Sequence, residues 1–369
     1  MKLISYIIAL LMPVLLCAND GMFMSEGGQL IPVKETSIEM QKEILYLKYT
    51  PLGIEVSVYF EFYNPGEARD EIVGFVTPPA SEDFMMSEEE REKIRTTKPE
   101  KHPYIEEFMV MVNEELLPYE VNYVAESGFN NDFFDERGGD YIYYFNVHFE
   151  KGINIIRHHY IFKGSGGLNE KSFAYRLTTG TMWAGGMIRD FNLVIDATNE
   201  DMTIFGPKHS GKRFLPWVMQ GVGNFQTLTD ATQVFMKSGV LQCHVDNFEP
   251  TSDLYIEFTP MHHYLLPITK GTELFQSGLL LNFFYFDPGE YKEGFQQDFE
   301  SLSDEEIQLL INFMYASKGY VFKTESIKND FLKCIWYIPD PNLNMENIEF
   351  SEREQALLNL LNDEREKRQ

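Results

Sequence analysis

Residues 301–341 read SLSDEEIQLLINFMYASKGYVFKTESIKNDFLKCIWYIPDP, and this stretch begins with a strong helix signal. Ser303 and Glu306 have the spacing of a capping box, in which each side chain binds a free backbone N–H of the first helical turn. From Ile307 onward, apolar residues recur at i, i+3, i+4 and i+7, the pattern of one buried helix face. Gly319 suits the left-handed end of a helix, so we expect this helix to stop there.

The rest of the C-terminal region continues the helical pattern. A second helix is expected to start at residue 324, and Ser351 with Glu354 forms another capping-box pair that predicts a last helix. The turn sequence Asp287-Pro288-Gly289 interrupts the chain upstream. We therefore expect a small all-α module over residues 295–369.

A family resemblance is carried by residues Asn312–Tyr320, Phe322 and Trp336–Pro339. These residues are similar to the YARHG domain of exported bacterial proteins, a family named for its Tyr-Ala-Arg-His-Gly core. The chain keeps Tyr315, Ala316 and Gly319 of that core and has Ser317 and Lys318 in place of the Arg and His. Ile311 also replaces an Arg that the family prefers. The resemblance implies export and implies no reaction.

The N-terminus has the pattern of a secretory signal over residues 1–18. Lys2 precedes a nearly continuous apolar run that is shorter than the roughly 20 residues a membrane span requires. Leu16 stands where lipoprotein processing needs a small residue before an acylated Cys17. We therefore expect cleavage after Ala18, release to the periplasm or the exterior, and no transmembrane segment in the mature chain.

Length, composition and charge limit the class of protein. With 369 residues, 44% hydrophobic and 14% aromatic residues, the chain is long and apolar enough for a multi-domain protein with packed cores. Its net charge of −26 repels nucleic acid and anionic lipid surfaces, which excludes both as expected partners.

The region before the helical module predicts a mainly β fold. Apolar and polar residues alternate in several short segments, such as 54–62 and 141–149, and Gly, Pro and Asn turns separate them. Helical patterns do not alternate with these segments, which favours antiparallel β-sandwich units over a parallel sheet. We expect two such units, over residues 19–125 and 126–290.

The β region carries a second resemblance, on Gly27-Gly28, Lys34, Ile38–Met40, Glu43, Phe62, Asn64, Phe75 and Pro78, and later on 173–180 and 183–188. These residues resemble an uncharacterised family of exported bacterial proteins with a β-rich N-terminal region. The resemblance implies a fold and a location, and it implies no catalytic residues.

The sequence contains few residue patterns that are typical of a metal or catalytic site. The pairs His158-His159 and His262-His263 could hold a metal, but neighbours on a strand point to opposite faces, so we expect no metal and no cofactor. Cys243 and Cys334 fall in different predicted modules, and no disulfide is assumed. A GxSxG elbow is absent from the sequence, and among 57 acidic residues a pair of carboxylates carries no information about a hydrolytic site.

The aromatic cluster of the helical module is the candidate ligand-binding site: Tyr315, Lys318, Tyr320, Trp336 and Tyr337. Flat rings with polar edges suit the recognition of sugars and peptides. The alternative is that a module this small needs these rings for its core. Within the cluster we expect Trp336 to be structural and Tyr320 or Tyr337 to be partly exposed.

These observations lead to one functional hypothesis and one competitor. We expect an exported, non-enzymatic cell-envelope protein of the binding or scaffolding type, whose ligand is a glycan, a cell-wall peptide or a partner protein. The competing hypothesis is a secreted hydrolase with its site in a cleft between the β units. An open face lined with aromatic residues would favour binding, whereas a histidine within hydrogen-bond reach of a nucleophile would favour the enzyme.

Overall fold

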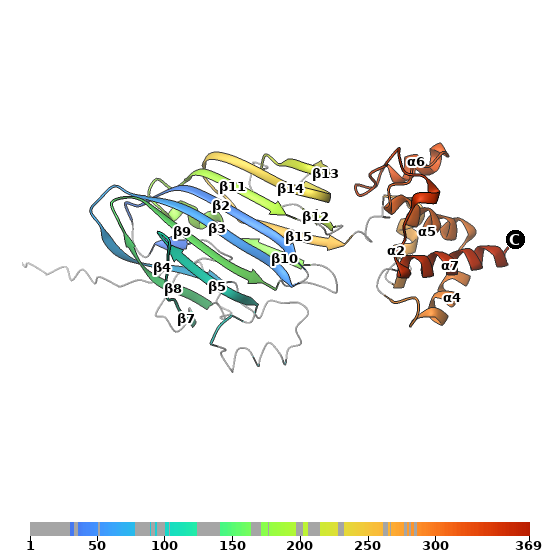
Figure 1. The fold of residues 1–369 in the computed structure, drawn as a ribbon, viewed down its shortest axis with the longest axis horizontal. Coiled ribbons are helices and arrows are strands. Elements are labelled where there is room, and N and C mark those ends of the chain that lie inside the picture. Colours follow the sequence, from blue (N-terminus) through green and yellow to red (C-terminus); the bar gives the residue numbers. More distant parts are fainter. Residues whose placement is uncertain are drawn as a thin grey trace, which may run out of the picture.

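The computed structural model describes residues 30–32, 36–50, 52–77, 89, 93, 100–102, 104–123, 141–163, 171–175, 177–196, 202–205, 215–227, 232–260, 265, 267–276, 279, 282–283 and 286–369. The predicted signal peptide, its cleavage position and the pair His262-His263 lie outside these residues. Figure 1 shows a β-rich body followed by a group of helices that ends at the C-terminus. The mainly β fold with a small all-α C-terminal module is therefore confirmed.

Two sheets make up the described part of the β body. The smaller has four strands in the order β1 (Leu30–Pro32), β4 (Arg69–Thr77), β8 (Tyr141–Phe149) and β7 (Glu120–Tyr123). The larger has eleven strands, whose path runs β10 (Lys171–Tyr175), β15 (Leu254–Pro260), β12 (Met202–Phe205), β14 (Thr232–Phe248), β11 (Ile188–Asp196), β2 (Glu39–Thr50), β3 (Gly53–Asn64), β9 (Gly152–Phe162), β5 (Ile105–Val112) and β6 (Glu115–Leu116), with β13 (Val218–Thr227) paired to β14. A short 3-10 segment, η3 (Leu177–Met182), precedes β11.

The central strands alternate as the sequence pattern predicts. In β3, Val56, Val58, Phe60 and Phe62 are buried, while the polar residues between them lie on the opposite face. Neighbouring strands run antiparallel in most of the large sheet, but β11 and β2 are parallel. The sheet thus has one apolar inner face and one mixed outer face.

Aromatic side chains join the inner faces of the two sheets. Phe75 on β4 lies 5.2 Å from Phe108 on β5 and 5.1 Å from Tyr160 on β9, measured between ring centroids. Tyr143 on β8 lies 4.8 Å from Phe108. The sheets therefore pack face to face over one shared hydrophobic core, as in a sandwich.

The predicted division of the β region near residue 125 needs correction. Strand β3 pairs with β9, β4 pairs with β8, and β2 pairs with β11, so strands from both sides of that position share each sheet. Local alternation identifies strands but not their partners, because pairing between distant segments depends on the whole fold. The segments assigned to two units form one body.

The helical module contains α2 (Thr269–Gln276), α4 (Lys292–Glu300), α5 (Asp304–Ser317), α6 (Glu325–Phe331), the 3-10 segment η5 (Met345–Asn347) and α7 (Glu352–Lys367). Both predicted capping boxes are present: the backbone N–H of Ser303 donates to Glu306 at 2.7 Å, and that of Ser351 donates to Glu354 at 2.7 Å. Gly319 follows α5 with φ of 91°, the left-handed conformation predicted for it.

The core of this module begins earlier than residue 295. Leu265, Ile268, Leu274 and Phe283 are buried in the same apolar cluster as the later helices. The Arg353 guanidinium of α7 donates to the backbone carbonyl of Phe283 at 2.6 Å. The turn at 287–289 therefore lies within the helical module, which begins before the expected residue 295.

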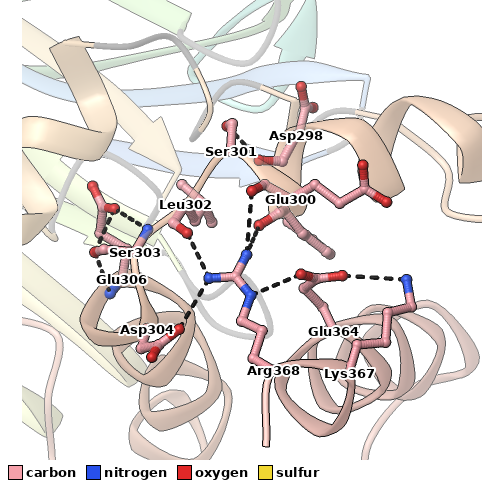
Figure 2. A network of polar contacts seen from close by, with 11 residues as sticks. Asp298, Glu300, Ser301, Leu302, Ser303, Asp304, Glu306, Glu364, Lys367 and Arg368 are labelled. Carbon is pink, nitrogen blue, oxygen red and sulfur yellow. Dashed lines mark hydrogen bonds and ion pairs between the residues drawn. The ribbon is translucent and has the colours of Figure 1, made fainter.

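Arg368, just after α7, connects the C-terminal end of the module to the segment between α4 and α5 (Figure 2). Arg368 donates to the backbone carbonyls of Leu302 at 2.6 Å and Phe299 at 2.8 Å, and to the Glu364 carboxylate at 2.7 Å. Although burial acts the other way, the bond from Arg368 is the main reason why the pKa of Glu364 lies below its usual value. These bonds hold the end of α7 against the link between α4 and α5.

The β body and the helical module touch at β13 and β14. The Asn224 side chain donates to the backbone carbonyl of Ile335 at 2.8 Å, and Phe235 belongs to the apolar cluster of the helices. Figure 1 shows the ends of these strands facing the helices. Within the described ranges, none of the helices combines the length and apolar character that crossing a bilayer requires.

Candidate ligand-binding site

The two C-terminal aromatic residues of the predicted site are buried. Trp336 is 3% exposed and Tyr337 is 2% exposed. Trp336 packs edge-on against Phe313 at 5.3 Å, and the Tyr337 hydroxyl donates to the backbone carbonyl of Tyr320 at 2.7 Å. Both rings therefore serve the core and offer no face to a ligand.

The other three predicted residues lie at the edge of the helical core. Tyr315 and Tyr320 are half-buried, with their ring centroids 6.0 Å apart. Lys318 forms a 2.8 Å ion pair with Glu354, so its charge is already matched within the module. Burial tends to raise the pKa of Glu354, but the hydrogen bonds from Lys318 and Ser351 lower it below its usual value. The structure brings these three residues together at the edge of the helical core.

A different surface has the shape of a ligand site. A groove of about 360 Å³ lies on the outer face of the large sheet, over strands β2, β3, β9 and β5. It is within the 300–1,000 Å³ range of small-molecule sites. Its lining residues are Ile44, Tyr46, Ser57, Val58, Tyr59, Met109, Met111, Leu116, Arg157, His158 and His159. We call this surface the sheet groove.

Strand register places the outward lining residues in two rows across the sheet. Within each row the residues are direct cross-strand neighbours, close enough for their side chains to touch. One row contains Ile44, Tyr59, Arg157 and Met111, and the other contains Tyr46, Ser57, His159 and Met109. The four strands thus bring distant parts of the sequence into one site.

An irregularity in β5 turns the two methionines outward. From Glu106 to Met109 the chain takes three steps on β5 against two on β9, which is the pattern of a β-bulge. Glu107 occupies the extra position with φ of 55°. As a result Phe108 points into the core, whereas Met109 is 47% exposed in the groove.

A tight turn forms the edge of the groove beyond β5. Asn113 and Glu114 join β5 to β6 with φ of 45° and 76°, the positive values of a type I′ hairpin turn. The Asn113 side chain accepts a 2.8 Å hydrogen bond from the backbone N–H of Ile155, which fixes the turn to β9. Leu116 follows the turn and is 66% exposed at the groove edge.

Arg157 is the cation of the groove. Its guanidinium lies over the Tyr59 ring, 5.2 Å from the centroid, in a cation–π arrangement. The Tyr59 hydroxyl donates to Glu61 at 2.7 Å; burial first, and then this bond, raise the pKa of Tyr59. Arg157 is exposed and forms no ion pair or hydrogen bond with any residue in the described ranges.

Other polar groups of the groove are tied to neighbours. The Tyr46 hydroxyl donates to Asp196 at 2.6 Å, and burial together with this bond raises the pKa of Tyr46 to about 12. Ser57 Oγ and His159 Nδ1 are 3.0 Å apart and share a hydrogen bond. The second ring nitrogen of His159 has no partner among the described residues.

The adjacent histidine faces the other way, as expected for neighbours on a strand. His158 lies in the core, where its ring is 5.6 Å from Phe60 and 5.5 Å from Phe75. Neither of its ring nitrogens has a hydrogen-bond partner in the described part of the chain. Burial therefore lowers the pKa of His158 to about 3.

The histidines and cysteines singled out in the sequence have ordinary surroundings where the structure describes them. Over the described ranges, His, Cys, Asp and Glu side chains do not form a group of three or more able to hold a metal ion. Cys243 and Cys334 are both buried and free. Burial raises the pKa of each thiol to about 12, which makes both unreactive near neutral pH.

The chain is similar to a solved structure over most of its length and to a domain family at its C-terminus. No curated protein matches it in sequence. A crystal structure of a proposed nutrient binding protein from Legionella pneumophila is similar, with 16% identity, a TM-score of 0.53 and coverage of 93% of this chain and 99% of that one. The uncovered share is smaller than the helical module, so the shared fold extends over both the β body and the helices.

A second solved structure shares less than the Legionella protein does. Native leukotriene A4 hydrolase from Saccharomyces cerevisiae matches at 8% identity and a TM-score of 0.24, over 56% of this chain and 29% of that chain. A TM-score this low supports no conclusion about function. At the C-terminus, residues 290–365 match the YARHG domain family, in agreement with the resemblance of Asn312–Tyr320.

Proposed function

We propose that this protein is an exported binding protein whose ligand occupies the sheet groove. The observation that carries the proposal is an open apolar and aromatic surface with a cation at its centre, Arg157, that no described residue pairs. Concave sites lined by apolar and aromatic side chains with a few polar groups are typical of small-molecule binding. The sequence hypothesis of a binding protein is kept. Its small-molecule site is now proposed in the sheet groove instead of the aromatic cluster of the helical module.

The comparisons support the proposal at the level of protein class. The Legionella structure, which has the same two-part fold, carries a proposed nutrient-binding role. The YARHG match at residues 290–365 fits the export that the sequence resemblance implies. These two findings point to a binding protein of the cell envelope and leave its ligand open.

The export route is part of the proposal. We expect signal cleavage after Ala18 and no lipid on Cys17, because Leu16 is too large for the position before an acylated cysteine. Intact-mass spectrometry of the native protein tests this: a chain beginning at Asn19 is the expected result. An acylated Cys17 would contradict the proposed processing.

Ligand retention tests the groove while the ligand is still unidentified. The mature protein is incubated with the small-molecule fraction of the producing cell's envelope, washed and denatured, and the released compounds are identified by mass spectrometry. Ser57→Trp fills the groove from its centre, since Ser57 lies between Tyr46 and His159 in one row. We expect compounds that wild type retains and Ser57→Trp does not.

Lys237→Trp is the matched control, because it places the same side chain on an exposed strand position outside the groove. This control should retain the same compounds as wild type. Equal retention by wild type and Ser57→Trp, or no retained compound in either, would contradict the proposal that the groove is the binding site.

One observation favours the competing hydrolase hypothesis. Ser57 and His159 form a hydroxyl–imidazole pair at 3.0 Å, which is the contact between a nucleophile and its base. However, the backbone of Ser57 is paired with strands on both sides, so the N–H groups around it are not free to bind an oxyanion. Among the described residues, no carboxylate contacts the second ring nitrogen of His159 to orient it.

The two hypotheses differ in what Ser57→Ala does. If the protein only binds its ligand, Ser57→Ala still retains it, since the smaller side chain leaves the groove open. Wild type and Ser57→Ala then both leave the ligand unhydrolysed. A hydrolase would release product from wild type and lose turnover in Ser57→Ala. Product formation from retained compounds, followed by mass spectrometry, separates these outcomes.

A further inference from the structure

We propose that the ligand of the sheet groove is a small organic monocarboxylic acid with an apolar or aromatic body. Its carboxylate binds Arg157, and its body lies over Tyr59, Met109 and Met111. This inference rests on the proposed function and names the chemical class that the same site selects. Charge, hydrogen-bond donors and apolar surface each support it.

The charge of the groove favours an anion. Elsewhere on the protein, Lys42 is paired with Asp190 at 2.8 Å and Lys151 with Glu67 at 2.9 Å. Among the described residues, Arg157 instead has the face of Tyr59 beside it. In a chain with a net charge of −26, a guanidinium that pairs with no carboxylate of the described ranges makes the groove locally positive. An arginine presents a planar fork of N–H donors that matches a carboxylate with two parallel hydrogen bonds.

The available donors lie on one strand of the groove, β9. The hydroxyls of Tyr46 and Tyr59 already donate to Asp196 and Glu61, so they are committed to carboxylates of the protein. Arg157 and the second ring nitrogen of His159 remain for a ligand. These two residues are two positions apart on β9 and therefore share its outer face. A single carboxylate satisfies this donor set.

The two carboxylates that accept hydrogen bonds from Tyr46 and Tyr59 disfavour a ligand with more than one negative charge. Glu61 and Asp196 flank the groove through their bonds to Tyr59 and Tyr46. A second carboxylate on the ligand would approach one of these groups and be repelled, since like charges close together are destabilising. The site therefore selects a monoanion.

The rest of the groove suits an apolar body. Ile44, Met109, Met111 and Leu116 supply aliphatic and thioether surface around the Tyr59 ring. Methionine is unbranched and polarisable, and it makes favourable contacts with aromatic rings. A ring or short alkyl chain removes this exposed surface from water, which stabilises the complex by the hydrophobic effect.

A matched series of probes tests the charge requirement. Isothermal titration calorimetry on the mature protein compares 3-phenylpropionate, the neutral 3-phenylpropionamide and the cationic 3-phenylpropylamine. Replacing a charged acceptor by a neutral one typically weakens a hydrogen-bonded pair by more than 1 kcal/mol, so we expect the acid to bind about tenfold or more tightly than the amide. The amine should bind most weakly.

Arg157→Met is the test variant, since it removes the charge and keeps an apolar side chain at an exposed position. We expect it to weaken binding of the acid by about tenfold or more and to leave binding of the amide within about twofold. Arg157→Lys should fall between, because it keeps the charge without the planar fork. Circular dichroism confirms that each variant retains the fold.

The outcomes separate this inference from the proposed function. Amide or amine binding as tight as that of the acid, or acid binding unchanged in Arg157→Met, would overturn the monocarboxylate and leave the groove as a binding site. Absence of binding by all three probes would also overturn the inference. The proposed function is then decided by ligand retention in wild type and Ser57→Trp, which does not depend on these probes.

Discussion

At the scale of single residues, the buried ring of His158 makes the folded protein less stable at acidic pH. Its ring lies among Phe60 and Phe75 with both nitrogens unpartnered in the described part of the chain. The pKa of His158 is about 3 in the folded protein, below the usual value near 6.5. As the pH falls below about 6.5 the unfolded chain binds a proton that the folded chain refuses, so stability is lost as the solution becomes acidic.

We predict that His158→Phe removes this acid sensitivity. Wild type should lose about 2 kcal/mol more than the variant between about pH 6.5 and pH 5, measured by urea unfolding at each pH. His159→Phe is the control, because His159 lies on the outer face and is half-exposed. Curves of unfolding free energy against pH that run parallel for wild type and His158→Phe would contradict this prediction. They would mean that His158 has the same pKa in the folded and the unfolded chain.

The aromatic residues of the helical module differ in burial, and their loss should differ in cost. Trp336→Ala removes a ring that contacts Phe313 and Phe331, and it should destabilise the protein by about 3–5 kcal/mol. Tyr320→Ala removes a half-buried ring but keeps the carbonyl that accepts from Tyr337, so about 1 kcal/mol is expected. Thermal unfolding compares them; equal losses would contradict the assigned burial.

Recognition by the helical module stays a prediction, and it now depends on Tyr315 and Tyr320. A pull-down with purified cell-wall material should be weakened by Tyr320→Ala if this edge binds a glycan or peptide. Binding that is unchanged by Tyr320→Ala would leave the module with a structural role only.

At the scale of elements, the bulge in β5 decides which side chains face the groove. Glu107 has φ of 55°, a conformation that glycine adopts without cost and that costs other residues about 1–2 kcal/mol. We predict that Glu107→Gly is more stable than Glu107→Ala by about 1 kcal/mol in urea unfolding. An alanine variant as stable as the glycine variant would contradict the positive φ at this position.

The elements also show what could be read from sequence. Strong local signals predicted β3, β8 and both capping boxes, because alternation and cap spacing depend on neighbours in the chain. Strand β13 was missed, since VMQGVGNFQT has two glycines and a weak pattern. The bulge at Glu107 was invisible, because it depends on register with β9 rather than on the residues of β5 alone.

At the scale of the whole molecule, the boundary between the β body and the helices is testable. The sequence predicts cleavage at Asp287–Gly289. The structure places this turn within the helical module: Pro288 is buried, and Arg353 binds the carbonyls of Phe283 and Phe286.

We therefore predict that limited proteolysis of the full chain with a broad-specificity protease gives no early cut at 287–289, because Pro288 is buried and Arg353 binds the carbonyls of Phe283 and Phe286. Amino-terminal sequencing of the fragments locates any early cut. An early cut at 287–289 would instead support the boundary expected from sequence.

The candidate site could not be found from sequence because its residues come from four strands. Tyr59 and Arg157 are about 100 positions apart in the chain, and only the pairing of β3 with β9 makes them neighbours. One signal was present in the sequence: Tyr59 stands at an outward position of the alternating segment 54–62. The aromatic cluster near Trp336 was more visible because it is local in sequence, but it fills a core.

Methyl NMR tests the location of the binding site most directly. The mature protein is labelled with ¹³C at the methionine methyl groups, Met109 and Met111 are assigned by Met→Leu substitution, and 3-phenylpropionate is added. We predict saturable shifts of the Met109 and Met111 methyls, with no shift at Met314 in the helical core. Binding seen by calorimetry that leaves both groove methyls unchanged, or that shifts Met314 instead, would contradict the assignment of the sheet groove as the ligand site.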